Sequence, residues 1–305
     1  MLIGTIIMLG IMRALSALPL GFHYACGRFL SWFLKNVMRY RRDVVMINLS
    51  RSFPDKKYKE LSEIADEFYK HFGRLIAEAV WFGGCRNPER LHRQRIVEYS
   101  NIDDFDKVYA ESKGIVALYS HLGNWELMGG CASYDYREGG HLPDGLDPND
   151  VVFVYKPLKS RMWDEIMRKN RCAPVLRIGY DSYVSSEDFL RYAVRNRGRK
   201  LVVNVNTDQS PYKNSTVDDT VDFMNQKTKT MLGAASIACK FGWSVLYSSM
   251  VPAGKGHYEW RFTEITKDAS TMTPHEIMQE YYRLLQADIE AYPWCYLWSH
   301  KRWKR

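Results

Sequence analysis

The amino-acid sequence predicts an α/β fold in which a mainly parallel, mixed β-sheet is flanked by helices, preceded by an N-terminal membrane-associated helical segment. Short apolar runs alternate with helical patterns from residue 114 onward, which is typical of a parallel sheet covered on both faces. The runs are almost entirely apolar, as expected for strands buried on both sides. The chain has 305 residues, of which 46% are hydrophobic, and this is enough for a sizeable core.

Several runs have the length and composition of strands. Buried parallel strands are predicted at residues 114–120 (GIVALYS), 151–155 (VVFVY), 201–206 (LVVNVN) and 243–251. Residues 258–265 alternate between apolar and polar, which favours an antiparallel or edge strand, and a short strand is expected near residues 95–99. Ligands in such sheets bind beyond the carboxyl ends of the strands, so the residues that follow each strand are the first candidates for a site.

The segments between the strands carry helical patterns. Helices are predicted at residues 61–83, from about 124, and at 162–169, 185–198, 230–241 and 273–291. The last begins with Thr273-Pro274-His275-Glu276, a capping box with proline at the first helical position. Residues 138–149 hold three glycines and two prolines and are predicted to form a loop.

The first 34 residues contain only two formal charges, Arg13 and Arg28. Neither uncharged stretch reaches the roughly 20 apolar residues that span a bilayer. We interpret the segment as an interfacial or re-entrant helical anchor. The alternatives are a tilted span in which Arg13 snorkels to the surface, and an ordinary buried helix.

A basic cluster at residues 39–42 follows the apolar segment and favours the cytoplasmic side of a membrane. The predicted organisation is therefore a hydrophobic and basic membrane anchor over residues 1–45 and a catalytic domain over residues 46–305. The aromatic and basic residues 294–305 either contact lipid headgroups or an acidic carrier protein, or pack as a C-terminal cap.

The net charge of +8 suits a partner that is anionic, such as lipid, an acidic carrier protein or nucleic acid. No RNP motif, helix-turn-helix signature or Cys/His finger spacing is present, so we expect no nucleic-acid partner. The six cysteines are scattered without a CxxC pair, which indicates a reducing, cytoplasmic compartment. The sequence predicts no cofactor and no metal; a site built on His121 and Asp208 would lack a helical HxxxH pair.

A histidine and a glutamate follow the first apolar strand, in the segment 120–126 (SHLGNWE). On one continuous helix, five residues turn about 500°, which would leave His121 and Glu126 roughly 140° apart. If the strand ends at His121 and the chain turns through Gly123, Glu126 enters a first helical turn and can fold back to the imidazole. A carboxylate there would fix the tautomer of the ring.

No G-x-S-x-G nucleophile elbow accompanies this pair, so the predicted role of His121 is direct general-base catalysis on an acceptor hydroxyl. The alternative is structural: a packed strand-end histidine, followed by a glutamate that the helix dipole favours in the first turn.

The segment 121–126 (HLGNWE) resembles the HFGNWE motif of the bacterial lipid A biosynthesis acyltransferases, the late lauroyl/myristoyl transferase group. Further motifs follow in the family's order. An early LPL and residues 39–55 (RYRRDVVMINLSRSFPD) resemble its N-terminal region, and 155–157 (YKP) its Tyr-Arg-Pro motif. Residues 207–209 (TDQ) resemble its Asp-Gln strand end, and 296–304 (YLWSHKRWK) its closing W-x-H-R-R-[FW]-K. The resemblance covers most of the chain.

This resemblance implies a glycerol-3-phosphate acyltransferase-like fold with an H-x4-[DE] pair, in which His121 is the base and Glu126 its partner. The implied donor is an acyl thioester of acyl carrier protein, and the implied acceptor is a hydroxyl of a lipid A precursor. The implied location is the cytoplasmic face of the cell inner membrane. A tetrahedral oxyanion would need hydrogen-bond donors, for which backbone N–H groups around Gly123 and a nearby cation are candidates.

Six positions are expected to contact substrate: Asn124, Tyr155, Lys156, Arg177, Asp208 and Gln209. Lys156 stands where the family usually has arginine, and lysine lacks the bidentate fork, which puts the identity of the acceptor in question. The alternatives are an exposed strand-end lysine, a solvated arginine at 177, and an Asp208–Gln209 pair that braces its loop. For the whole chain, the alternatives are an acyltransferase for another membrane lipid and a non-catalytic lipid-binding protein.

Overall fold

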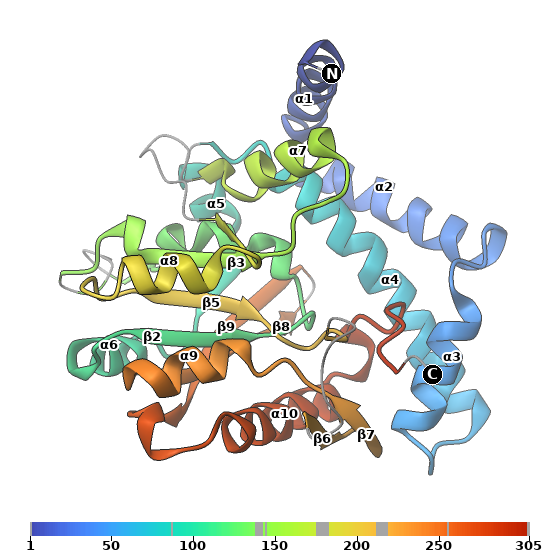
Figure 1. Cartoon of the computed structure of the whole chain (residues 1–305). Helices are drawn as coiled ribbons and strands as arrows, with labels where there is room; N and C mark the ends of the chain where they lie inside the picture. Colours follow the sequence, from blue (N-terminus) through green and yellow to red (C-terminus); the bar gives the residue numbers. More distant parts are fainter. Residues whose placement is uncertain are drawn as a thin grey trace.

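The computed structural model describes residues 2–86, 88–137, 143, 145–174, 183–211, 219–254 and 256–303. Seven strands form one sheet in the order β1-β9-β8-β2-β5-β3-β4 (Figure 1). Their bounds are β1 Val97–Tyr99, β2 Ile115–Tyr119, β3 Val151–Tyr155, β4 Tyr183–Ser185, β5 Val202–Asn206, β8 Ser244–Gly254 and β9 His257–Thr266. All neighbouring pairs are parallel except β8 and β9. The predicted mixed, mainly parallel sheet flanked by helices is confirmed.

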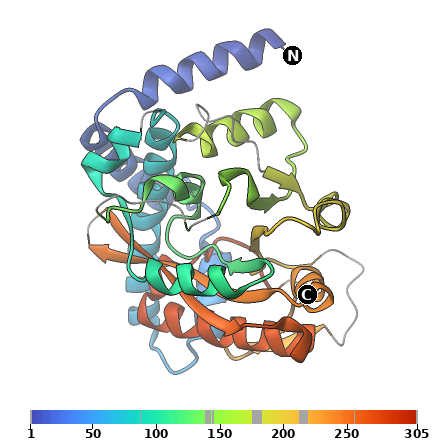
Figure 2. The ribbon, with the colours of Figure 1, turned by 90° about the vertical axis from the view of Figure 1, so that its left-hand side faces the viewer.

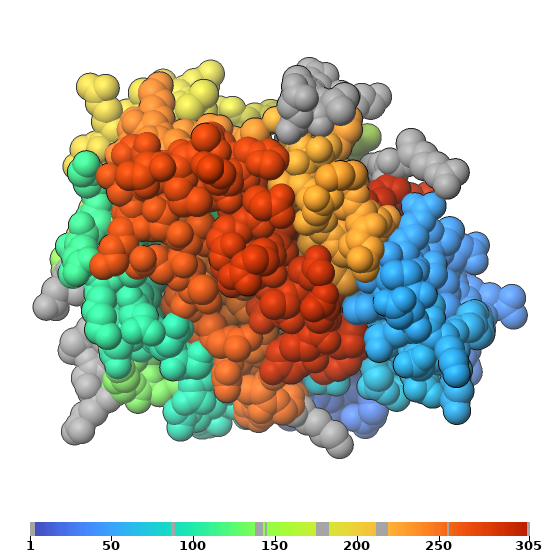
Figure 3. All heavy atoms as spheres, turned by 90° about the horizontal axis from the view of Figure 1, so that it is seen from below, coloured from blue at the N-terminus to red at the C-terminus, as the bar shows by residue number. Residues whose placement is uncertain are grey.

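Ten α-helices surround this sheet in the described part of the chain. They are α1 Leu2–Ser16, α2 Leu20–Trp32, α3 Arg42–Ser52, α4 Tyr58–Phe82, α5 Pro88–Gln94, α6 Ile102–Glu111, α7 Arg161–Arg171, α8 Phe189–Arg195, α9 Gly233–Phe241 and α10 Pro274–Ala291. The expected capping box opens α10, because Thr273 and Glu276 bond to each other's backbone N–H groups. Seen from below, α10 lies across the centre of the molecule beside the N-terminal helices (Figure 3).

The core has one cluster on each face of the sheet. On β2, Val116 and Leu118 join the cluster that includes α9 and α10, whereas Ile115 points to the opposite cluster. This alternation is the two-residue period of a strand, and the burial of both faces explains why the strand is apolar throughout.

The register of β2 and β5 places their carboxyl ends together. Tyr119 is opposite Asn206, and the pairing continues one step further because Thr207 N–H donates to the carbonyl of Tyr119 (3.2 Å). The loops that leave the two strands, residues 120–124 and 207–211, therefore start side by side, as the arrowheads of β2 and β5 show (Figure 1). This edge is the one at which the sequence predicts a site.

The N-terminal helices lie at one side of the molecule. α2 packs along α4, while α1 extends away over α7 (Figures 1 and 2). No single described helix is long and apolar enough to cross a membrane; the pair Gly4–Ser16 and Leu20–Val37, which includes the π-helix η1 (Phe33–Val37), reaches that length and composition together, with a bend of 108°.

Several elements differ from the prediction, among them α3 and the short strand β4, which were not predicted. The helix after Asn124 is the 3₁₀-helix η2 (Trp125–Ser133), in which two adjacent glycines weaken the α-helix. The hairpin of β6 (Thr220–Phe223) and β7 (Gln226–Lys229) was not predicted, because its turn places Met224 and Asn225 at positive φ and methionine is no hairpin signal.

The described C-terminal residues pack as a cap. Trp298 is fully buried, Arg302 is buried against Tyr282 and the carbonyl of Lys229, and Trp303 Nε1 donates to Thr228 (2.8 Å). The sequence left open whether this segment contacts lipid headgroups or a carrier protein, or packs as a cap. These contacts agree with a packed cap for the described residues up to 303. Three further 3₁₀ turns complete the fold: η3 (Pro148–Asp150), η5 (Ala269–Thr271) and η6 (Pro293–Cys295).

Candidate active site

His121 and Asp208 meet at the carboxyl ends of β2 and β5. The Nδ1 atom of His121 lies 2.7 Å from Oδ1 of Asp208, and the backbone N–H of His121 donates to Oδ2 of the same carboxylate (3.1 Å). The side chain of Asp208 is 2% exposed and that of His121 is 15% exposed. The imidazole is thus held on one side by a buried acid while its other side is not sealed in the core.

The other ring nitrogen of His121 faces two side-chain amides. Its Nε2 atom lies 2.9 Å from Nε2 of Gln209 and 3.3 Å from Nδ2 of Asn206. Amide nitrogens only donate, so Nε2 of His121 is the acceptor of these two hydrogen bonds. The proton of the ring is therefore on Nδ1, which donates a hydrogen bond to Asp208. This is the tautomer of a general base, whose Nε2 lone pair can take a proton from a substrate hydroxyl.

The carboxylate of Asp208 is kept ionised. Burial by itself raises its pKa, but the electrostatic interaction with His121, the two hydrogen bonds from His121 and the charge of Arg302 outweigh burial, so the pKa of Asp208 is below its ordinary value. A negative charge at Asp208 stabilises the imidazolium that forms when Nε2 takes up a proton.

Glu126 has a different partner from the one expected. Arg171, the last residue of α7, binds both of its carboxylate oxygens, at 2.6 and 2.7 Å, and the indole N–H of Trp125 donates to Oε1 (3.1 Å). Burial raises the pKa of Glu126, yet the charge and bonds of Arg171 lower it overall, with a smaller contribution from His121. The direct carboxylate partner of His121 is therefore Asp208, and Glu126 acts on the ring only through the electric field.

Gly123 explains the turn between the strand and η2. Its φ is +67°, and a Cβ atom would collide with the carbonyl oxygen of Met250, so only glycine fits. Its N–H donates to the carbonyl of Cys295 (3.1 Å), and its carbonyl accepts from Nε2 of the buried His71 (3.1 Å). The N–H of Gly123 was a candidate oxyanion donor, but the C-terminal segment already occupies it.

Asn124 lies inside the loop and not at its surface. It is fully buried, its Oδ1 accepts from the N–H of Glu126 (3.3 Å), and its Nδ2 donates to Glu78 (2.7 Å). Both ends of its amide are thus bound to the protein, so this geometry favours a structural role over the expected substrate contact.

Tyr155 and Lys156 lie at the same edge of the sheet. Tyr155 ends β3, next to β5, and its hydroxyl donates to Asp164 (3.3 Å); Lys156 follows as an exposed residue. Arg177 lies outside the described residues. Asn206 and Arg171 were not predicted: Asn206 reads as one residue of an apolar strand, and Arg171 as one basic residue at a helix end.

A separate apolar cavity lies against the last turn of η2. It has room of about 50 Å³ for water-sized molecules, and it is lined by residues such as Tyr99, Phe105, Cys131, Trp260 and Phe262. No residue of the loop 120–126 lines it.

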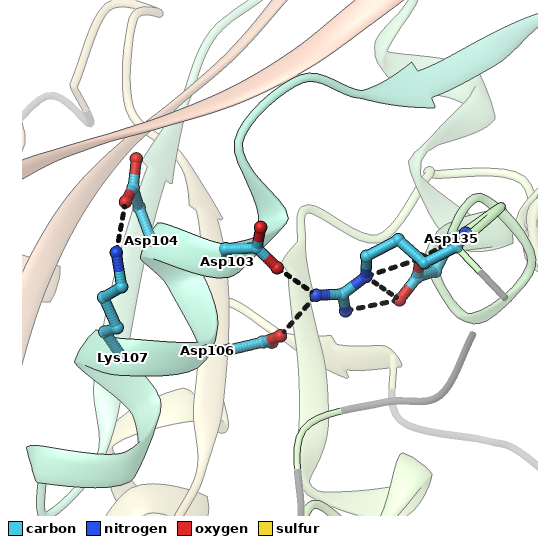
Figure 4. A network of polar contacts seen from close by, with 6 residues as sticks. Asp103, Asp104, Asp106, Lys107 and Asp135 are labelled. Carbon is cyan, nitrogen blue, oxygen red and sulfur yellow. Dashed lines mark hydrogen bonds and ion pairs between the residues drawn. The ribbon is translucent and has the colours of Figure 1, made fainter. Parts of the chain in front are cut away.

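A polar cluster stands near the mouth of this cavity. Arg137 joins Asp135 (2.6 Å) to Asp103 and Asp106 (2.9 Å) of α6 (Figure 4). The cluster joins α6 to the chain that follows η2. Because its side chains are partly exposed, each ion pair contributes little to stability.

Comparison with known proteins completes the assignment. The family model of the bacterial lipid A biosynthesis acyltransferases matches residues 2–140 and 182–305, which include the whole His121 loop, Asp208 and Gln209. A search of curated proteins finds no match to this chain. Members of the matching family transfer acyl groups, so the chain is an acyltransferase that acts on lipid. Since the family model spans most of its length, this protein belongs to the bacterial lipid A biosynthesis acyltransferase family.

Proposed function

We propose that the protein transfers a fatty acyl chain from acyl carrier protein to a hydroxyl of a lipid A precursor, with His121 as the general base. The observation that carries this proposal is the orientation of the imidazole: Nδ1 faces Asp208, and Nε2 accepts from the amides of Gln209 and Asn206. An acceptor hydroxyl that replaces one of these amides would donate to the same lone pair.

In the proposed reaction, Nε2 of His121 takes the hydroxyl proton while the oxygen forms a bond to the thioester carbonyl carbon. The tetrahedral oxyanion then expels the thiolate of the carrier, and this sulfur receives the proton from His121. Asp208 stabilises the imidazolium between the two proton transfers. The ester product and the free carrier thiol balance the reaction.

Glu126 takes a supporting role in this scheme. Its carboxylate adds negative potential near the imidazolium and holds Arg171 at the edge of the site. The guanidinium of Arg171 is the nearby cation that suits the developing oxyanion. Tyr155, Lys156 and Gln209, at the ends of the neighbouring strands, and Arg177 are proposed to bind the acceptor.

We further propose that the N-terminal helices rest on the cytoplasmic face of the inner membrane, where the acceptor lipid resides. Large apolar side chains are exposed there on neighbouring elements: Ile6, Ile7, Ile11 and Leu15 on α1, Phe22, Phe29 and Trp32 on α2, and Trp163 on α7. Phe29 is 66% exposed. Exposed apolar side chains on neighbouring helices suit a lipid interface.

Three variants test the roles of the histidine and the two acids. His121→Ala is expected to lower kcat by about 10²–10⁴-fold, the usual contribution of a general base. Asp208→Asn is expected to approach this loss, because both oxygens of Asp208 accept from His121 and an amide satisfies only one of them. Glu126→Gln is expected to lose less.

The order of these losses decides the assignment. Acyl transfer retained in folded His121→Ala protein would refute the general-base role. A larger loss of kcat in Glu126→Gln than in Asp208→Asn would mean that Glu126, and not Asp208, orients the imidazole. Mass spectrometry of lipid A from cells with and without the gene identifies the acceptor. Unchanged lipid A, with an acyl chain missing from another lipid, would refute the lipid A precursor as substrate.

A further inference from the structure

Glu78 is a buried carboxylate on α4 that no step of the proposed reaction uses. Its side chain is completely buried and accepts three hydrogen bonds: from Asn124 Nδ2 (2.7 Å), from Tyr258 Oη (2.8 Å) and from Tyr24 Oη (3.1 Å). A carboxylate inside a protein is costly unless its oxygens are hydrogen-bonded. The three donors therefore need Glu78 as their acceptor, and the buried carboxylate needs their three hydrogen bonds.

The contact with Asn124 reaches the active-site loop. Asn124 is three residues from His121 and is the N-cap of η2, because its Oδ1 accepts from the N–H of Glu126 (3.3 Å). With Oδ1 occupied in this way, Nδ2 is the atom that points to Glu78. Glu78 thus fixes the orientation of the Asn124 side-chain amide, and this amide caps the first turn of η2.

The contact with Tyr24 reaches the apolar N-terminal helices. α2 and α4 touch so closely that a Cβ atom on Gly27 would lie 2.8 Å from the carbonyl oxygen of Gly73, and Ser31 Oγ donates to the carbonyl of Tyr69. Such small-residue contacts leave little freedom for the two helices to slide. α2, α4 and the His121 loop are therefore one connected body, with Glu78 at the junction.

We propose that Glu78 is a positioning residue for the His121 reaction: it holds Asn124 and so places the loop that presents His121 and Glu126, and through Tyr24 it ties that loop to α2. The proposal rests on the proposed function of His121. Because a shift of about 1 Å at a reacting group can lower the rate about 100-fold, a residue outside the site can control kcat in this way.

A reciprocal exchange tests the contact between Glu78 and Asn124. In Glu78→Leu no acceptor is left for Asn124 Nδ2, whereas in Glu78→Gln the amide oxygen can still accept from Asn124 while the amide nitrogen donates to the hydroxyl of Tyr24. In Asn124→Asp two carboxylates would meet. The double variant Glu78→Gln, Asn124→Asp restores one donor opposite one acceptor, with the polarity reversed, and the new carboxylate at position 124 still accepts from the N–H of Glu126. Acyl transfer from acyl carrier protein to a lipid A precursor in detergent is measured for the wild type and all four variants, together with thermal unfolding.

Glu78→Leu is expected to lower kcat about 100-fold without a change in the KM of the acceptor, since the loop and not the binding surface is displaced. Glu78→Gln is expected to keep most of its kcat, and the double variant is expected to have a higher kcat than Asn124→Asp alone. Effects of Glu78→Gln and Asn124→Asp that simply multiply would overturn the proposal. A Glu78→Leu protein with wild-type kcat, or with a loss equal to its unfolded fraction, would also overturn it.

Asp288→Asn is the matched control. Asp288 on α10 is likewise mostly buried and accepts from two hydroxyls, those of Tyr247 (2.8 Å) and Ser249 (2.6 Å), but these partners lie on β8 and not on the loop. It is expected to lose thermal stability and keep kcat; a loss of kcat like that of Glu78→Leu would mean that general destabilisation explains both. His121→Ala is assayed alongside: if it stays active, the general-base function fails, whereas the exchange at residues 78 and 124 still reports their coupling.

Discussion

The buried His71 is expected to make the protein less stable in mild acid. Its Nε2 lies 3.1 Å from the carbonyl oxygen of Gly123, which only accepts, so Nε2 carries the proton of a neutral ring. The other nitrogen, Nδ1, is buried and has no partner among the described residues. Burial above all, and then the charge of Arg74, lower the pKa of His71 to about 3.

The sign and size of the effect follow from the difference between the pKa of His71 in the folded and in the unfolded protein. In the unfolded chain the pKa of a histidine is about 6.5, so the unfolded state takes up a proton at a pH where folded His71 does not. Stability from His71 is thus complete above about pH 6.5 and is lost as the pH falls toward 3. Between pH 7.5 and pH 5 the free energy of unfolding should drop by about 2 kcal/mol from this residue.

Urea unfolding of the wild type and of His71→Gln at both pH values measures the effect. Glutamine can still donate to Gly123 but does not titrate. The fall in unfolding free energy between the two pH values should therefore be about 2 kcal/mol smaller for His71→Gln than for the wild type. The other histidines contribute equally to both proteins and cancel in the comparison. An equal drop in the two proteins would refute the assignment of a neutral, buried His71.

Two other predictions concern the loop. Gly123→Ala should reduce the free energy of unfolding by at least about 1–3 kcal/mol, because of the positive φ and the collision with Met250, and should lower transfer; a variant as stable as the wild type in urea would contradict the geometry. Arg171→Met should cost about 3–5 kcal/mol because Glu126 is left buried without its cation, and Glu126→Leu in the same protein should restore much of the loss. Equal stability of the single and double variants would show that the ion pair is not the cause.

The sequence was most informative about the sheet and the edge that carries the site. Apolar runs at strand length predicted β2, β3 and β5, and parallel order then placed His121 and Asp208 at one edge. Buried parallel strands leave few alternative arrangements of their carboxyl ends, so local patterns were sufficient for this part.

The choice of partner for His121 depended on a contact that no local pattern shows. Glu126 lies five residues from His121 and was the natural choice from spacing, whereas Asp208 is 87 residues away. Arg171 comes from α7, 45 residues beyond Glu126, and binds both carboxylate oxygens. Three-dimensional packing thus gave the two carboxylates different partners, the imidazole of His121 for Asp208 and the guanidinium of Arg171 for Glu126, which sequence distance does not predict.

The isolated bridge between Leu122 and Tyr296 has a consequence for biosynthesis. It joins the catalytic loop to a segment made more than 170 residues later, and the N–H of Gly123 finds its acceptor on Cys295 in the same place. During translation, the loop therefore has no carbonyl to receive this N–H until Cys295 has left the ribosome. A nascent chain can build the helices and strands that precede this residue first, and it completes the geometry of the His121 loop only after residues 295 and 296 have been made.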